Sequence, residues 1–262
     1  IHADEENGAD EMKTDSFNLA GFSSISLGDL NKVKLRDRQD TKFVFHQNIL
    51  PLLLDKLNPF YQVLEINGMQ TFVYDNTYFD SDDFLFYKQH HNENRKRFKV
   101  RYRKYSSNIG LYFEIKTKNN KDRTIKKRLL VNERNGSLGE PERRLVSKII
   151  GLPPDQLTPK LELEFSRITL TDYSFNERLT IDTNLSAKNG TYSKIFDQLV
   201  ISEVKQKKYN PRSDFIRTMR NLKIPEMRIS KYCMGILHVY KGIKYNRFKP
   251  KLLRINKILT QE

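Results

Sequence analysis

The sequence predicts an α+β fold in which about eight antiparallel strands, enough to form a closed β-barrel, carry a few helices at the periphery. Three observations lead to this prediction. Apolar and polar residues alternate through most of the chain, as they do in strands that bury one face. Short polar turns separate neighbouring runs, as at residues 106–108 and 119–122. Helical spacing is limited to a few segments that no low-complexity linker divides, so we expect a single domain over residues 21–262.

The expected elements follow from local patterns. Alternation predicts strands over residues 42–45, 70–75, 97–103, 111–118, 124–129, 160–169, 176–182 and 199–207. Helical spacing and end signals predict helices over residues 47–57, 140–150, 210–222 and 230–240, with a short helix or docking segment between residues 22 and 35. The helix at 140 is the best defined, because Pro141 opens it, acidic residues fill its first turn and Gly151 ends it.

Composition limits the class of protein. The chain has 262 residues and 37% hydrophobic residues, enough for a core, which excludes a wholly disordered protein. The single cysteine, Cys233, excludes a disulfide framework and a Cys-rich zinc module, and is typical of a reducing compartment. No apolar stretch approaches the ~20 residues that cross a bilayer. We therefore predict a cytoplasmic protein, with the cytoplasmic face of a membrane as an open alternative, and a flexible acidic tail over residues 1–20.

The net charge of +15 leaves three kinds of partner open: nucleic acid, an anionic membrane surface, or a polyanionic small molecule. Its distribution narrows the choice, because many cations fall on alternate positions of predicted strands and therefore share a face. These sets are Lys99, Arg101 and Arg103; Glu114, Lys116 and Lys118; Lys126 and Arg128; and Glu203, Lys205 and Lys207. Like charges on neighbouring strands repel unless an anion lies between them. A barrel closed with these faces inward would hold phosphoryl groups on Lys and Arg, and a divalent ion on Glu.

Other motifs give weaker signals. The chain has no GxxxxGK phosphate loop and no local signature of a Ser/His/Asp or Cys/His site. We expect His90 and His91 to lie in a hydrophilic turn, and Cys233 to be a packed helix residue. Residues 241–251 mix basic and aromatic side chains, which favours a basic surface tail over contact with nucleic acid or an anionic membrane.

Several short motifs, in order, resemble one known family. They include Asp40-Thr41-Lys42-Phe43, Tyr78-Phe79-Asp80, Lys99-Val100-Arg101-Tyr102-Arg103, Phe113-Glu114-Ile115-Lys116, Phe165-Ser166-Arg167, Arg178-Leu179-Thr180-Ile181-Asp182, Ser202-Glu203-Val204-Lys205 and Ser230-Lys231-Tyr232. This order is similar to the VTC domain, the polyphosphate polymerase domain of the vacuolar transporter chaperone type, over about residues 30–240. The family belongs to the CYTH-like triphosphate tunnel metalloenzymes, whose fold is a closed antiparallel tunnel.

The resemblance implies transfer of the γ-phosphoryl group of ATP to a growing polyphosphate chain, with Mn²⁺ or Mg²⁺ as cofactor. It implies catalytic roles for Lys42, Arg101, Arg103, Lys116 and Lys231, phosphate binding by Lys126, Arg167 and Arg178, and metal binding by Glu203. The strand-face pattern adds Lys99, Lys118, Arg128 and Lys205 as phosphate ligands, Glu114 as a metal ligand, and Glu162, Glu164 and Asp182 as second-rank metal candidates. ATP and polyphosphate are the implied partners, together with a membrane protein acting in trans, and nucleic acid is disfavoured.

Two features test this resemblance. Hydrolytic CYTH enzymes usually carry a Glu-x-Glu-x-Lys motif, whereas the matching positions here are Arg38, Asp40 and Lys42. The missing glutamate pair favours the polymerase, and leaves a tunnel triphosphatase and a non-catalytic polyphosphate- or RNA-binding module as alternatives. Arg167 shares strand parity with Leu163 and Phe165, which puts it on an apolar face unless a bulge intervenes.

Overall fold

The computed structural model describes residues 17–31, 38–107, 110–120, 124–134 and 136–260. Within them, eleven strands form one sheet. They are β1 (Ser23–Ile25), β2 (Gln39–His46), β3 (Tyr61–Leu64), β4 (Thr71–Asp80), β5 (Arg97–Tyr105), β6 (Leu111–Lys118), β7 (Thr124–Val131), β8 (Thr158–Asp172), β9 (Glu177–Lys188), β10 (Ser193–Phe196) and β11 (Leu199–Gln206). Eight of them follow one antiparallel path in the order β2-β11-β9-β8-β4-β5-β6-β7, which agrees with the predicted strand number.

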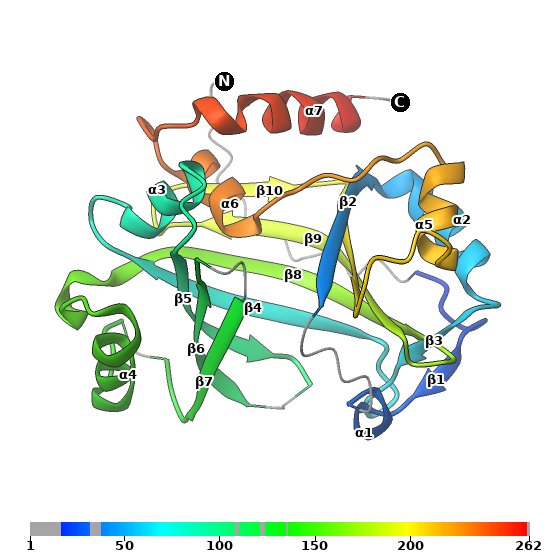
Figure 1. Ribbon diagram of the computed structural model, residues 1–262, viewed down its shortest axis with the longest axis horizontal. Coiled ribbons are helices and arrows are strands. Elements are labelled where there is room, and N and C mark those ends of the chain that lie inside the picture. The colour runs from blue at the N-terminus through cyan, green and yellow to red at the C-terminus, as the bar shows by residue number, and fades with distance from the viewer. Residues whose placement is uncertain (1–16, 32–37, 108–109, 121–123, 135, 261–262) are drawn as a thin grey trace.

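The prediction of a closed barrel is correct only in part. Figure 1 shows the sheet curling, with its end strands β2 and β7 in front of the long strands β8 and β9. In the described part of the chain the pairing path nevertheless ends at β2 and β7, so hydrogen bonds do not close the sheet. The antiparallel α+β class is confirmed, and closure is not.

Helices cover the outer side of the curled sheet and one end of its inner side. They are α1 (Leu27–Leu30), α2 (Leu50–Leu57), α3 (Leu85–His91), α4 (Glu140–Ile150), α5 (Asp214–Asn221), α6 (Lys231–Val239) and α7 (Lys249–Leu259). On the outer side, leucines of α2 and Phe215 of α5 pack on Ile181 and Val204, and Val146 of α4 packs on Phe113. Burying one face of each strand in this way leaves the alternate residues for the inner side.

Helix α6 fills one end of the inner side. It packs on β8, β9 and β10, and its apolar residues join a core that includes Leu161 and Leu163. Gly235 allows this close approach, because a Cβ atom there would lie 2.7 Å from a methyl carbon of Leu161. Beyond the end of α6, the same face of β8 continues to Arg167, whose guanidinium lies 5.1 Å from the Phe165 ring. Arg167 therefore does share the face of Phe165. The residues of this face are apolar where α6 covers them and charged beyond its end.

Most predicted helices are present, with corrections. Residues 47–57 form a 3₁₀ turn followed by α2, α4 has the predicted bounds, and α6 follows Ser230 as its N-cap. Helix α5 is shorter than predicted, because Ser213 caps it. His90 and His91 lie in the last turn of α3 and not in a turn between strands. In the described residues, no helix is long and apolar enough to span a membrane.

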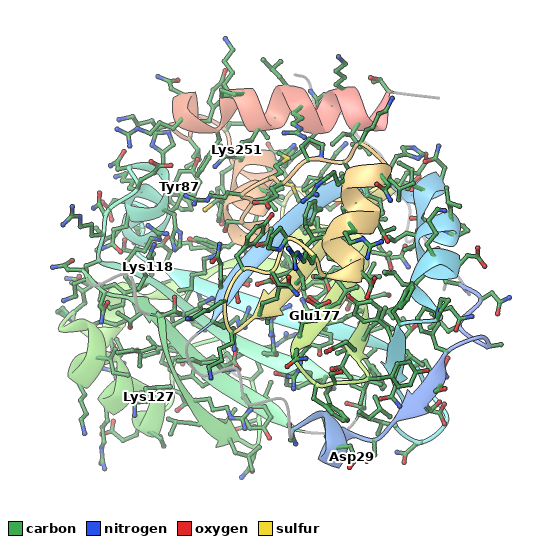
Figure 2. All side chains as sticks on the ribbon, turned by 45° about the vertical axis from the view of Figure 1, so that its right-hand side comes forward. Asp29, Tyr87, Lys118, Lys127, Glu177 and Lys251 are labelled. Carbon is green, nitrogen blue, oxygen red and sulfur yellow. The ribbon has the colours of Figure 1, made fainter. Side chains whose placement is uncertain are left out.

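Both ends of the chain differ from expectation where they are described. Leu19 is buried in the core beside α2, so the acidic tail predicted for residues 1–20 is wrong at this residue, and residues 1–16 lie outside the described part. The predicted basic tail at 241–251 leads instead into α7, whose Ile255 is buried. Lys251 of α7 lies at the same end of the molecule as Tyr87 of α3 (Figure 2), and Phe248 packs against Tyr87.

Candidate functional site

The predicted cations come together on one side of the sheet. We call this side the inner face and define it by Lys42 of β2, Arg101 of β5, Glu114 of β6, Arg167 of β8 and Glu203 of β11. Strand register places the other candidates with them: Lys99, Arg103, Lys116, Lys118, Lys126, Arg128, Arg178 and Lys205, while Lys231 reaches the face from α6. The twelve cations predicted as site residues thus face four carboxylates, those of Asp40, Glu114, Asp182 and Glu203. Lys207, predicted to share the face of Glu203 and Lys205, lies beyond the end of β11 and is exposed.

Three of these carboxylates each bind two cations. Glu203 pairs with Lys42 at 2.9 Å and with Lys205 at 3.6 Å. Glu114 accepts from Arg101 at 2.7 Å and also contacts Lys126. The third, Asp182, holds Arg167 and Lys231, each at 2.5 Å. Each acid therefore lowers the repulsion between two cations that strand pairing or helix packing brings together.

Glu114 and Asp182 are the most buried of these three carboxylates, and only 2% of each side chain is exposed. Burial opposes the ionisation of Glu114, yet the charges of Arg101, Arg103 and Lys126 lower the pKa of Glu114 to about 2. Arg101 donates to one Glu114 oxygen from two nitrogens, and Lys126 contacts the other oxygen. A carboxylate oxygen that accepts two nitrogens of one arginine holds that arginine in place, so Glu114 can position Arg101, and its metal role stays a prediction from the strand pattern.

Glu203 has a different environment, because a second carboxyl group lies beside it. Burial alone would raise the pKa of Glu203, but Lys205, Lys42 and a side-chain hydrogen bond with Asp40 bring it well below its usual value. Asp40 is opposite Lys205 in the pairing of β2 with β11. Two carboxylates that meet in this way can supply the oxygen ligands that Mg²⁺ or Mn²⁺ takes when substrate phosphates complete its coordination. The described residues contain no cluster of three or more His, Cys, Asp or Glu.

Three other inner-face cations, Lys99, Arg103 and Arg178, bind neutral oxygen atoms of the protein. Lys99 donates to Ser230 Oγ at 2.9 Å, and Arg103 donates to Asn76 Oδ1 at 2.7 Å. A guanidinium nitrogen of Arg178 donates to the carbonyl of Leu30 at 2.7 Å. Desolvation is the main cause that lowers the pKa of both Lys99 and Arg103, and the charge of Arg101 lowers both further. The inner face therefore carries positive charge that the protein itself leaves uncompensated, which favours an anionic ligand.

Lys116 gives a pH-dependent test of this charge. Its desolvation in the curled sheet and the charge of Lys99 lower its pKa to about 8, although its side chain remains open to water. Metal-free inorganic tripolyphosphate should bind the protonated form better, so the affinity is expected to fall by up to about tenfold between pH 7 and pH 9. The Lys116→Arg variant stays charged and should show a smaller fall in calorimetric titrations, while Lys205, whose pKa desolvation also lowers to about 8, still titrates. Equal pH profiles for the two proteins would contradict the assignment.

The second-rank metal candidates on β8 lie elsewhere. Glu162 forms an ion pair with Lys188 at 3.1 Å, and both side chains are well exposed. The half-buried Glu164 pairs in register with Asp75, on the strand face opposite Phe165. The inward side of β8 carries Leu163, Phe165 and Arg167, so alternation turns both glutamates outward. These two assignments are corrected by the structure.

Sequence reasoning missed three residues of the inner face. Asp40 stood inside a quoted motif but was weighed only as a departure from the Glu-x-Glu-x-Lys pattern. Tyr78 accepts a hydrogen bond from Arg101 at 2.8 Å, and Asn76 accepts from Arg103. Strand parity could have found both, because Asn76 and Tyr78 alternate along one strand whose partner in the sheet carries the two arginines.

Fold and site together define an α+β protein whose antiparallel sheet curls around a strongly basic inner face. The chain belongs to the VTC domain family, whose model matches residues 37–240, and this confirms the resemblance found in the motifs. No curated protein matches the chain in sequence.

Several solved structures are similar to this chain at low identity. A proposed adenylate cyclase from Bacillus halodurans is 14% identical with a TM-score of 0.49, and the match covers 74% of this chain and 95% of that one. A proposed adenylyl cyclase from Hippeastrum, described as having a dominant triphosphatase activity, is 13% identical with a TM-score of 0.49, over 78% of this chain and 97% of its own. The PH1819 protein from Pyrococcus horikoshii OT3 is 11% identical with a TM-score of 0.42, over 76% and 98% of the two chains. At these values the similarity says nothing further about activity.

Proposed function

We propose that this protein is a polyphosphate polymerase that transfers the γ-phosphoryl group of ATP to the end of a polyphosphate chain held along the inner face. The observation that carries the proposal is the set of twelve cations facing four carboxylates on one side of a curled sheet. Membership of the VTC domain family supports the same substrate class.

The proposed phosphoryl transfer needs no covalent intermediate with the protein. The terminal phosphate of a polyphosphate chain is ionised at neutral pH and can attack without a general base, so positioning and charge neutralisation dominate the rate. Arg101, Arg103 and Arg167 can hold phosphoryl oxygens through two nitrogens at once. Lys42, Lys116 and Lys231 add point charges around them. Arginines held by Glu114, Asn76 and Asp182 are oriented before substrate arrives, which lowers the reorganisation that transfer requires.

The implied divalent ion fits the residues present. Glu203 and Asp40 would hold Mn²⁺ or Mg²⁺, and the ion would neutralise charge on the phosphoryl oxygens. Before a metal binds, Lys205 and Lys42 keep Glu203 ionised, because their charges lower its pKa. The assignment of Glu203 as a metal ligand stays a proposal, and Asp40 joins it as the second ligand.

One observation favours a second candidate function, a tunnel triphosphatase. The meeting of Asp40 with Glu203 restores part of the carboxylate pair that the sequence pattern lacks. Such a pair could hold a metal and orient water, the attacking group in hydrolysis. Arg38 stands where the first glutamate of the hydrolytic motif would be, and it pairs with Asp40 at 3.0 Å. Membership of the VTC domain family keeps the polymerase as the first candidate.

A product assay separates the candidates. Purified protein with ATP and Mn²⁺ is expected to form chains that resolve as a ladder on a polyacrylamide gel stained for polyphosphate. Release of orthophosphate without chains would overturn the polymerase in favour of the triphosphatase. Unchanged ATP, with tripolyphosphate still bound, would reduce the protein to a binding module. A boiled sample and a reaction with EDTA are the controls for contaminating and metal-independent activity.

A further inference from the structure

Both oxygens of the buried Asp182 carboxylate accept hydrogen bonds from cations. Its Oδ1 atom accepts from Arg167 Nε at 2.5 Å. The other oxygen, Oδ2, accepts from a second Arg167 nitrogen at 2.7 Å and from Lys231 Nζ at 2.5 Å. Only 2% of the Asp182 side chain is exposed. This donor arrangement matches a bidentate clamp on arginine with a lysine added, and differs from the carboxylate pair formed by Glu203 and Asp40.

The clamp joins elements that are distant in the sequence. Asp182 lies on β9 and Arg167 on β8, where the two residues are paired, while Lys231 is the first residue of α6. The preceding residue, Ser230, caps α6 and accepts from Lys99 of β5, so two contacts fix the first turn of this helix to the inner face. A lysine side chain has four flexible bonds and much rotamer freedom. An anchor for its ammonium group therefore decides where its charge is held.

Aromatic rings of β4 and β8 pack against the two cations that Asp182 binds. The Phe165 ring lies 5.1 Å from the Arg167 guanidinium and 5.0 Å from Lys231 Nζ. Tyr74 packs against Arg167 at 4.6 Å. The two cations are thus held side by side over an apolar floor, with Asp182 as their shared counter-ion. Removing the carboxylate would leave two neighbouring cations that repel each other in a desolvated position.

We propose that Asp182 is a positioning residue that aims Lys231 and Arg167 at the phosphoryl groups of the substrate and does not bind the metal. This role rests on the proposed function for its reaction, but its effect on phosphate binding can be measured without turnover. It replaces the second-rank metal role that the sequence suggested for Asp182.

Charge is the second consequence of this arrangement. Desolvation lowers the pKa of Lys231, Arg167 of β8 lowers it further, and Asp182 of β9 and Glu203 of β11 oppose the shift. Lys99 of β5 adds positive charge beside Ser230, next to Lys231 in the chain. Without the charge of Asp182, Lys231 should lose its proton at lower pH. A merely structural role for Asp182 would not move this titration.

The test compares Asp182→Asn with Glu177→Gln, which alters another buried carboxylate in a separate hydrogen-bond network. The probe is metal-free inorganic tripolyphosphate, titrated by calorimetry between pH 7 and pH 9, and Mn²⁺ binding is followed by electron paramagnetic resonance. We expect Asp182→Asn to weaken tripolyphosphate binding about 10- to 100-fold, to move its alkaline decline to lower pH, and to leave Mn²⁺ affinity within about threefold. In the Asp182→Asn background, Lys231→Arg should restore binding at pH 9, because arginine stays charged.

Two results would overturn the proposal. Loss of Mn²⁺ binding with unchanged tripolyphosphate affinity would make Asp182 a metal ligand. Behaviour identical to that of Glu177→Gln in both assays would make it a purely structural residue. The proposed function fails separately: if the wild-type protein makes no polyphosphate but Asp182→Asn still shows the binding and pH effects, the positioning role stands and the polymerase does not.

Discussion

Replacement of Glu203 by Gln is expected to lower Mn²⁺-dependent turnover of ATP by about 10³-fold or more while the protein stays folded. The change keeps the size of the side chain but removes the charge that Lys42 and Lys205 share. It also removes one of the two carboxylates proposed to hold the metal. Initial rates, measured with Mn²⁺ varied from micromolar to millimolar, check the effect on chemistry and on metal affinity together.

A matched control comes from the opposite face of the same sheet. Glu162→Gln makes the same chemical change at an exposed ion pair with Lys188 and should leave turnover unchanged. A further variant tests the whole site, because Glu203→Ala combined with Lys231→Ala removes charges from two of the carboxylate clusters. Full activity in that double variant would refute the site assignment.

The largest loss of stability is expected at Glu177, away from the charges of the inner face. Figure 2 shows this residue inside the molecule, near α5. Its carboxylate accepts from Tyr61, from Gln206 at 2.5 Å and from the cap residue Ser213 at 2.9 Å, and thereby joins β3, β11 and α5. Glu177→Ala leaves buried donors unpaired, so it should destabilise the fold by about 2–5 kcal/mol. Thermal unfolding should show a fall in Tm of roughly 5–15 °C.

The pH dependence of this effect follows from the direction of the pKa shift. Burial raises the pKa of Glu177, and hydrogen bonds from Tyr61, Gln206 and Ser213 offset the shift only in part. The protonated form therefore favours the folded state, and this contribution is full below the unfolded pKa of about 4.3 and is lost as pH rises through the folded pKa. Glu177→Gln cannot titrate, so the wild-type stability relative to this variant should decline with rising pH in urea unfolding. If the free energy of unfolding of the wild type instead rose with pH relative to Glu177→Gln, the pKa of Glu177 would be lowered and not raised by folding.

Local patterns determined much of the fold. Alternation along the chain located each of the eight strands of the main path, because a strand with one buried face must alternate whatever its partners are. Proline and glycine fixed the ends of α4, since both act on the backbone within a few residues. Segments whose burial depends on distant contacts escaped prediction. Helix α7 is one, because its basic residues hid the apolar positions from which Ile255 reaches the core.

In the candidate site, too, local patterns predicted some features and distant contacts decided the others. By itself, the sequence determined which cations share a face, because side chains two apart on a strand point the same way, and so Lys99, Arg101 and Arg103 were found together. Only the tertiary structure decided which carboxylate serves which cation. Asp182 meets Lys231 from 49 residues away. Asp40, opposite Lys205 in the register of two strands far apart in the chain, comes beside Glu203. Such contacts arise from strand register and helix docking, which no local pattern encodes, and they separate the carboxylates that orient cations from the pair that can hold a metal.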